Sequence, residues 1–256
     1  MTKSFFLVLA GLALLTGCQT RPVSPPAVQS RSHTYVLVHG AWGGGWDWKT
    51  VDQLLAADGN KVYRPTLTGQ GEHSHLASTN INLATHIQDI VNVILWEDLH
   101  DVVLVGHSYG GMVITGVADR VPGRIQQLIY LDALLPENGE CVMEIGSKHI
   151  HKVVQNGFIL APWVKAGTPP PHDVPMSAQT FSQPITLTNQ AAARKLPAAY
   201  ILTVDKGDQP KDDDFYPFYL RAGARGWPTA IMEGDHNVQR THPQELARRL
   251  EAAPKD

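Results

Sequence analysis

The sequence predicts an α/β fold in which helices flank a mainly parallel sheet. Short apolar runs, typical of strands buried on both faces, alternate along the chain with segments whose apolar residues keep helical spacing. Such alternation makes the connections helical crossovers, and crossovers join parallel strands. In addition, the apolar run 102–105 leads directly into a glycine-flanked turn and then a helix. In sheets of this kind, active sites lie beyond the carboxyl ends of the strands.

The first half of the chain supplies clear elements. Strands are predicted over 35–38 and 61–64, with a helix over 46–57 between them. That helix has apolar residues on one side and ends at Gly59, because glycine adopts the left-handed conformation of helix ends at little cost. The segment 83–95 keeps one apolar face at helical spacing, which predicts an amphipathic helix.

The second half continues the alternation. The strand 102–105 is followed by a helix over 112–121 and a strand over 125–131. Two later apolar runs predict strands over 199–204 and 229–232. A final helix over 243–250 begins with a proline, which is tolerated in the first turn because its missing N–H would have no partner there.

One long stretch interrupts this pattern. Residues of about 134–194 mix aromatic residues and weak helical patterns with many prolines. An insertion of this length in a compact domain is most often a lid or cap over the site. We therefore expect a single domain over 33–256 that carries a cap insertion. Prolines of this stretch include Pro162, Pro169, Pro170, Pro171, Pro175 and Pro184.

The composition is that of a soluble globular protein. Of the 256 residues, 43% are hydrophobic and 18% are charged, and the formal net charge is −3. Nucleic acid is not an expected partner, because its binding relies on a strong basic field.

The N-terminal segment is predicted to be an export signal. Lys3 supplies a positive charge, and the apolar run 5–15 is too short to span a bilayer. The four residues that end at Cys18 resemble a bacterial lipobox, so 1–18 is read as a lipoprotein signal peptide and Cys18 as the lipidated residue; a chance cysteine in an ordinary signal is the alternative. Residues 19–32 then form a flexible tether. We therefore expect an exported lipoprotein that its lipid anchors to the membrane, at the outer membrane or the periplasmic face.

The cysteine count has two consequences. Cys18 and Cys141 are the only cysteines, so lipidation of the first leaves the second without a disulfide partner. A metal site built on cysteines is excluded as well. The glycine run 43–45 lacks the Lys-Ser/Thr of a phosphate-binding loop, so no nucleotide or other cofactor is expected.

A run of five residues, Gly106-His107-Ser108-Tyr109-Gly110, has the form G-x-S-x-G. A buried strand precedes it and a helix follows, which is the context of a nucleophile elbow. The glycines suit a tight turn in which the helix packs closely on the strand. The alternative is a serine that merely caps the helix. We predict that Ser108 is a nucleophile.

A serine hydroxyl needs a base, and His236 is the predicted one. It follows the last strand and precedes the last helix, where the base belongs in the order Ser…Asp…His. His39 and His107 are expected to shape turns near Ser108. Five other histidines are expected in exposed loops or the cap, without a metal: His73, His75, His149, His151 and His172.

The third member of a triad orients the imidazole and stabilises its charge. Asp205, at the end of the strand 199–204, is the predicted acid. Asp132, at the end of the strand 125–131, is the first alternative and Asp208 the second. Backbone N–H groups must also hold the developing oxyanion. Tyr109 and Ala41 are the predicted donors.

Several motifs together resemble one branch of the α/β hydrolases, which holds plant methyl-salicylate esterases, hydroxynitrile lyases and related bacterial esterases. The resemblance spans 33–250 and implies the α/β-hydrolase fold, with Ser108, Asp205 and His236 as its triad. The motifs are His39-Gly40-Ala41-Trp42, the run 67–75 (LTGQGEHSH), Gly106 to Gly111, Tyr130 to Ala133, Asp205-Lys206-Gly207 and Asp235-His236.

Two positions favour one activity of that branch. The lyases carry Thr where this chain has Gly40, and Lys where it has Asn237. In the lyases these two groups are the usual ones that interact with the cyanide released from a cyanohydrin, and this chain lacks both. The expected reaction is therefore hydrolysis of small-molecule carboxylic esters through an acyl-enzyme. The alternatives are a lactone or amide hydrolase, a lyase on the same fold, and a non-catalytic ligand-binding homologue.

Overall fold

The computed structural model describes Thr2, residues 32–146 and residues 154–253. Apart from Thr2, the predicted signal peptide lies outside these residues, as do Cys18 and nearly all of the tether, so lipidation stays a prediction. The folded unit extends from Ser32. None of the described helices is both long and apolar enough to cross a membrane.

The centre of the folded unit is a six-stranded sheet in the order β2-β1-β3-β4-β8-β9, in which every neighbouring pair is parallel. The predicted α/β architecture is therefore confirmed. Its strands are β1 (Thr34–Val38), β2 (Lys61–Tyr63), β3 (Val102–His107), β4 (Ile125–Leu131), β8 (Ala198–Val204) and β9 (Thr229–Glu233).

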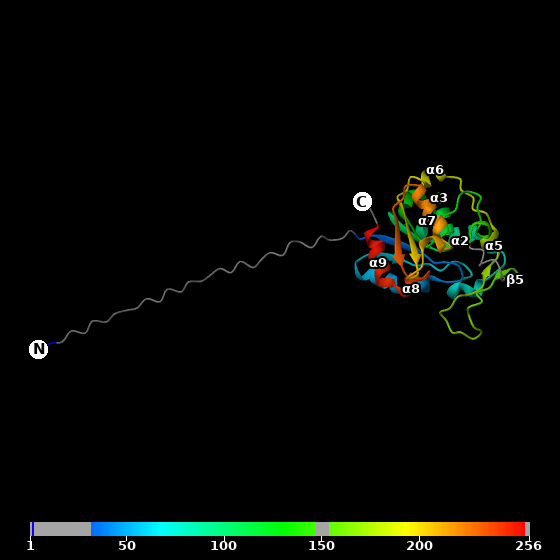
Figure 1. Ribbon diagram of the computed structural model, residues 1–256, viewed down its shortest axis with the longest axis horizontal. Coiled ribbons are helices and arrows are strands. Elements are labelled where there is room, and N and C mark those ends of the chain that lie inside the picture. Colours follow the sequence, from blue (N-terminus) through cyan, green and yellow to red (C-terminus); the bar gives the residue numbers. More distant parts are fainter. Residues whose placement is uncertain (1, 3–31, 147–153, 254–256) are drawn as a thin grey trace. The chain divides into compact units, whose positions relative to one another are not determined.

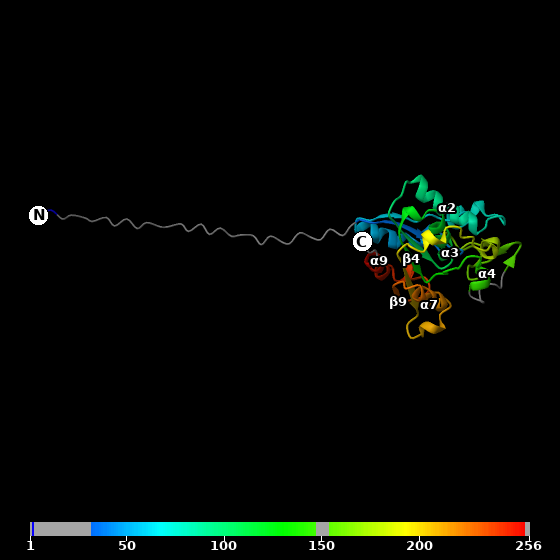
Figure 2. The same cartoon turned by 90° about the horizontal axis from the view of Figure 1, so that it is seen from above.

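Helices cover both faces of this sheet (Figures 1 and 2). The apolar sides of three helices pack on one face: α2 (Leu83–Trp96), α3 (Gly110–Arg120) and α7 (Tyr216–Ala224). Three others cover the opposite face: α1 (Lys49–Ala57), α8 (Val238–Thr241) and α9 (Pro243–Ala252). Short 3-10 helices span Gly45–Trp48, Gly71–Leu76, Pro122–Arg124 and Pro210–Asp212.

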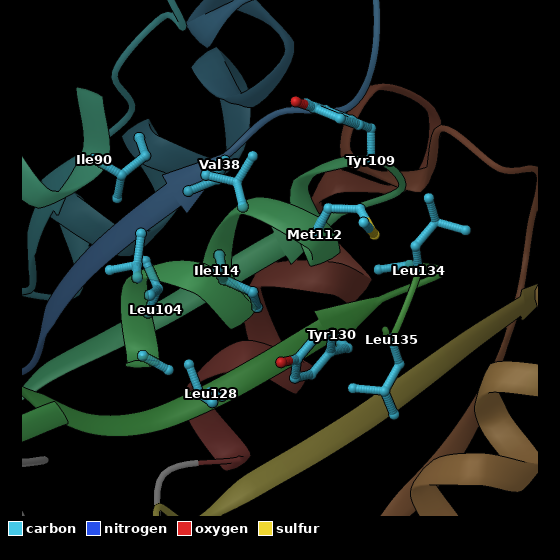
Figure 3. Close-up of a cluster of buried hydrophobic side chains, with 14 of the residues drawn as sticks. Val38, Ile90, Leu104, Tyr109, Met112, Ile114, Leu128, Tyr130, Leu134 and Leu135 are labelled. Carbon is cyan, nitrogen blue, oxygen red and sulfur yellow. The ribbon is translucent and has the colours of Figure 1, made fainter. Parts of the chain in front are cut away.

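Two buried clusters hold the layers together. Successive residues of a strand point to opposite faces, so Leu104 belongs to one cluster while Val103 and Val105 belong to the other. Figure 3 shows the first cluster, to which Leu104 and Leu128 of the sheet and Ile114 of α3 belong. Each such side chain stabilises the fold by about 1.5–3 kcal/mol relative to exposure. The strands are thereby fixed, and so is the edge at which their carboxyl ends meet.

The chain between β4 and β8 contains a second, antiparallel sheet that the sequence patterns did not predict. Its strands are β5 (Val154–Gln155), β6 (Phe158–Ile159) and β7 (Met176–Ser177). The short helices α4 (Val142–Ile145), α5 (Gln179–Ser182) and α6 (Gln190–Ala193) complete the segment. Two-residue strands lie below the length at which alternation of apolar residues can be recognised.

Candidate active site

Ser108 lies in a strained turn between β3 and α3. Its φ is +55°, a left-handed conformation that residues other than glycine rarely adopt. Three backbone hydrogen bonds hold the turn: the Ser108 N–H donates to Leu131 O at 3.2 Å, and its carbonyl accepts from Gly111 N at 3.0 Å and Leu134 N at 3.1 Å. Strain maintained in this way is typical of functional positions.

Two glycines of the motif are explained by close backbone approaches. A Cβ on Gly106 would lie 2.7 Å from the carbonyl oxygen of Gly110, and one on Gly110 would lie 2.8 Å from that of Val38. The elbow therefore brings helix α3 so close to β1 and β3 that side chains do not fit at these positions.

His236 lies in the loop between β9 and α8, and its ring is held on two sides. Phe215 stacks on it with centroids 4.8 Å apart and planes 12° apart, and His107 packs at 4.5 Å and 40°. Because a carbonyl only accepts, His107 Nε2–H must donate in its 2.7 Å contact with the His236 carbonyl oxygen. Burial is the main reason that the pKa of His107 lies well below its usual value, which keeps this ring neutral.

The carboxylate beside His236 belongs to Asp132. Its Oδ2 lies 2.6 Å from His236 Nδ1, and its Oδ1 accepts a hydrogen bond from Thr203 N–H at 3.1 Å. The Asp132 side chain is only 1% exposed. A buried carboxylate needs such partners, because water no longer solvates it.

The structure thus corrects the choice of Asp205 as the acid beside His236, and the first alternative takes that place. Asp205 is exposed and starts a turn closed by a hydrogen bond from Asp208 N–H to its carbonyl; Asp208 is exposed as well. Asp132 follows β4, the direct neighbour of β3, whereas Asp205 follows β8, one strand further from Ser108.

Ser108 and His236 line one cavity of about 350 Å³. Ala41 and Trp42, from the loop after β1, form another part of its wall. The structure therefore brings together the predicted nucleophile, the predicted base and one of the two predicted oxyanion donors.

The other predicted donor, Tyr109, is fixed by its side chain. The Tyr109 ring stacks on Phe181 at 5.7 Å, and its hydroxyl lies 3.0 Å from His86 Nδ1. His86 Nε2–H donates to the Thr68 carbonyl at 3.0 Å, so Nδ1 is the acceptor for the tyrosine. Within the described ranges, the backbone N–H groups of Ala41 and Tyr109 donate to no other backbone group.

His39 shapes the loop that carries Ala41. Its Nδ1–H donates to Gly40 O at 2.8 Å, and its Nε2 accepts from Leu67 N–H at 3.0 Å. Burial lowers the pKa of His39 to about 4, so the ring is neutral and both bonds persist at neutral pH.

A charged cluster in the cavity wall escaped the sequence analysis. Arg240 of α8 forms an ion pair with Asp47 at 2.7 Å and lies 3.5 Å from Asp173. Asp173 also accepts a hydrogen bond from Trp163 Nε1–H at 2.7 Å. Burial raises the pKa of Asp47 to about 6, although Arg240 opposes this rise. No sequence motif marks these residues, because they are far apart in the chain.

Other reactive groups offer no further centre in the part of the chain that the structure describes. No group of three or more His, Cys, Asp or Glu residues there could hold a metal ion. His149 and His151 lie outside the described residues. Cys141 is buried and unbridged.

Comparison with known proteins agrees with this geometry. Residues 35–249 match the sequence model of the alpha/beta hydrolase family. A carbendazim hydrolyzing esterase from Nocardioides sp. (strain SG-4G) is 37% identical over 241 residues, which cover 85% of this chain and 98% of that protein. Salicylic acid-binding protein 2 of Nicotiana tabacum is 34% identical over 107 residues, or 41% of this chain and 40% of its own length.

A solved structure shares the fold. An extracellular alpha/beta-hydrolase from a Paenibacillus species superposes with a TM-score of 0.70 at 23% identity, covering 88% of this chain and all of that one. Its description reports homology to tobacco salicylic acid binding protein 2. Named esterases recur among the relatives, which supports ester hydrolysis as the activity. The chain belongs to the alpha/beta hydrolase family, in the branch of plant methylesterases, hydroxynitrile lyases and bacterial esterases.

Proposed function

We propose that the protein hydrolyses carboxylic esters of small molecules through an acyl-enzyme, with Ser108, His236 and Asp132 as its triad. The observation that carries this proposal is the 2.6 Å contact between Nδ1 of His236, which lines the same cavity as Ser108, and Oδ2 of the buried Asp132. Because Nδ1–H donates to the carboxylate, Nε2 is left as the unprotonated base.

The proposed reaction has two halves. In the first, His236 Nε2 takes the Ser108 hydroxyl proton while Oγ bonds to the ester carbonyl carbon. The oxyanion accepts hydrogen bonds from the backbone N–H groups of Ala41 and Tyr109. As the carbon–oxygen bond to the alcohol breaks, the imidazolium returns the proton to the leaving alkoxide.

In the second half, water replaces the alcohol. His236 removes a proton from the water, whose oxygen attacks the acyl carbon. Collapse of the second tetrahedral intermediate releases the carboxylic acid and returns the proton to Ser108 Oγ. The Asp132 carboxylate stabilises the imidazolium in both halves without taking its proton.

The local structure favours hydrolysis over cyanohydrin cleavage. A Cβ at position 40 would lie 3.0 Å from Cβ of Ser108 and 3.1 Å from Nδ1 of His107. Asn237, the residue after His236, is neutral and lines the cavity. The resemblance associates the lyases with a hydroxyl side chain at position 40 and a cation at position 237. This chain has Gly40 and Asn237 there, and therefore neither feature.

Turnover of p-nitrophenyl acetate by Ser108→Ala tests the proposal. The expected result is a loss of at least 10³-fold in kcat, since the nucleophile is removed. A fluorophosphonate probe should label the unsubstituted protein and not the variant. Unchanged turnover in folded Ser108→Ala would overturn the triad, and a protein that neither turns over esters nor takes the label would be a ligand-binding homologue. A panel of lactones, amides and esters that includes carbendazim and methyl salicylate would then define the substrate.

A further inference from the structure

A second cavity adjoins the Ser108 cavity. It has a volume of about 340 Å³ and shares Trp163, Asp173 and Arg240 with the first. The remaining residues of each cavity wall differ, so these three side chains form the partition between the two spaces. The other walls of the second cavity come from Trp46, Val164, Lys165, Thr168, Pro171 and His172.

The partition is anchored at one end. Asp47 is buried, with a side chain only 3% exposed, and its Oδ1 lies 2.7 Å from Arg240 Nε. The Arg240 guanidinium also lies 4.5 Å above the Trp46 ring, where the cation is attracted by the ring face. Arg240 is therefore fixed from two sides, and it belongs to the helix that follows His236.

The other end of the partition is held more weakly. Asp173 lies 3.5 Å from Arg240, which is long for an ion pair, and it accepts the 2.7 Å hydrogen bond from Trp163 Nε1–H. Trp163 is 56% exposed, and its ring meets Trp42 edge-on at 5.0 Å and 88°. The Trp163 indole thus lies between the two cavities. One hydrogen bond and one aromatic contact hold it there, and it is not buried in the core.

We propose that Trp163 is a specificity-determining residue that limits the size of the ester accepted beside Ser108. The indole closes the Ser108 cavity on the side of the second one, so compact esters bind and esters that carry a second fused ring meet the partition. Removing the indole joins the two spaces and relieves that limit. The inference rests on the proposed esterase function of Ser108.

The test compares two p-nitrophenyl esters, the acetate and the 2-naphthoate. For each variant, the measured quantity is the ratio of kcat/KM for the naphthoate to that for the acetate. Trp163→Ala is expected to raise this ratio at least tenfold, because even one methylene too many in a closed pocket changes kcat/KM by about 10–200-fold. A ratio within twofold of the unsubstituted protein would overturn the proposal.

Two further variants separate this effect from general loosening. Trp96 is 87% exposed on α2 and lines neither cavity, so Trp96→Ala is the matched control and should leave the ratio unchanged. Asp173→Ala removes the acceptor for Trp163 Nε1–H and should raise the ratio in the same direction, by less. If Trp163→Ala does not fold, Asp173→Ala decides the question. An equal rise in Trp96→Ala would contradict the proposal.

Failure of the inference and failure of the proposed function are distinguishable. If Ser108→Ala loses acetate turnover while Trp163→Ala leaves the ratio unchanged, only the role of Trp163 is refuted. If Ser108→Ala retains turnover, the esterase site itself is refuted and the inference falls with it.

Discussion

His236 Nδ1 and Asp132 Oδ2 lie 2.6 Å apart, and the second oxygen of the same carboxylate is bound to the Thr203 backbone N–H. Asp132 therefore connects the imidazole to the carboxyl end of β8 while it is itself fixed at the end of β4. Phe215 and His107 hold the ring from both sides. The orientation of His236 is thus determined by rigid elements of the sheet edge and not by its loop alone.

Asp132→Asn is expected to lower kcat/KM for p-nitrophenyl acetate by about 10⁴-fold, as loss of the acid does in other triads. An amide in place of the carboxylate can present its NH₂ group to Nδ1 and favour the wrong tautomer of His236. Asp205→Asn is the matched control, because that side chain is exposed, and it should retain at least half of the activity. Loss of activity in Asp205→Asn with retention in Asp132→Asn would restore the sequence-based choice.

Most of the central sheet could be predicted because its strands are short, strongly apolar runs between helices of clear periodicity. The run 102–105 is an example: its four residues are all apolar and all buried, as expected for a strand that is covered on both faces. The segment between β4 and β8 could not be predicted in the same way. Its strands have two residues each, and their pairing depends on contacts with distant parts of the chain, such as the bond from Trp42 Nε1–H to Ile159 O.

The acid beside His236 shows why spacing alone was not sufficient. Asp132 and Asp205 both follow buried strands that end at the same sheet edge, so order along the chain does not separate them. Their neighbours do differ: Ala133, Leu134 and Leu135 are buried, whereas Lys206 to Gln209 are exposed. A carboxylate followed by apolar residues is forced into the interior, where it requires a partner such as an imidazole. That signal was present in the sequence.

Gly106→Ala is expected to destabilise the protein by about 1–3 kcal/mol, the usual cost of overpacking. The new Cβ would lie 2.7 Å from Gly110 O and 3.0 Å from Ile114 Cδ1, so the elbow must shift. Gly223→Ala is the contrasting substitution, because Gly223 lies in α7 and the added Cβ would meet nothing within 4 Å beyond its chain neighbours and the backbone of its own helix. It should stabilise by roughly 0.5–1 kcal/mol, since alanine loses less backbone freedom in a helix.

Urea unfolding of both variants, followed by tryptophan fluorescence, checks these two changes. The same preparations should be assayed with p-nitrophenyl acetate, where Gly106→Ala is expected to lose activity and Gly223→Ala to keep it. Equal stabilities for the two variants would show that the close approach of α3 to β3 does not constrain position 106.

His39 is expected to make the protein less stable as the pH falls from 7 to 5. Burial lowers its folded-state pKa to about 4, below the unfolded value of about 6.5, so the unfolded chain takes up a proton first and is favoured in acid. The two pKa values correspond to a loss of about 2 kcal/mol over this range. Above pH 6.5 the contribution of His39 to stability is fully present, and it falls until the pH passes below about 4.

The contribution is isolated by comparing His39→Asn with the unsubstituted protein in urea unfolding at pH 7 and pH 5. The variant should be less stable at pH 7, since the bonds to Gly40 O and Leu67 N–H are disturbed. Between pH 7 and pH 5, the free energy of unfolding of His39→Asn should fall by about 2 kcal/mol less than that of the unsubstituted protein. Asp47 acts in the opposite direction, because its raised pKa favours the folded state as the pH falls. Both proteins contain Asp47, so its effect cancels when they are compared. His75→Asn, at an exposed position, serves as the control, and an unchanged loss in His39→Asn would show that this ring does not govern the acid response.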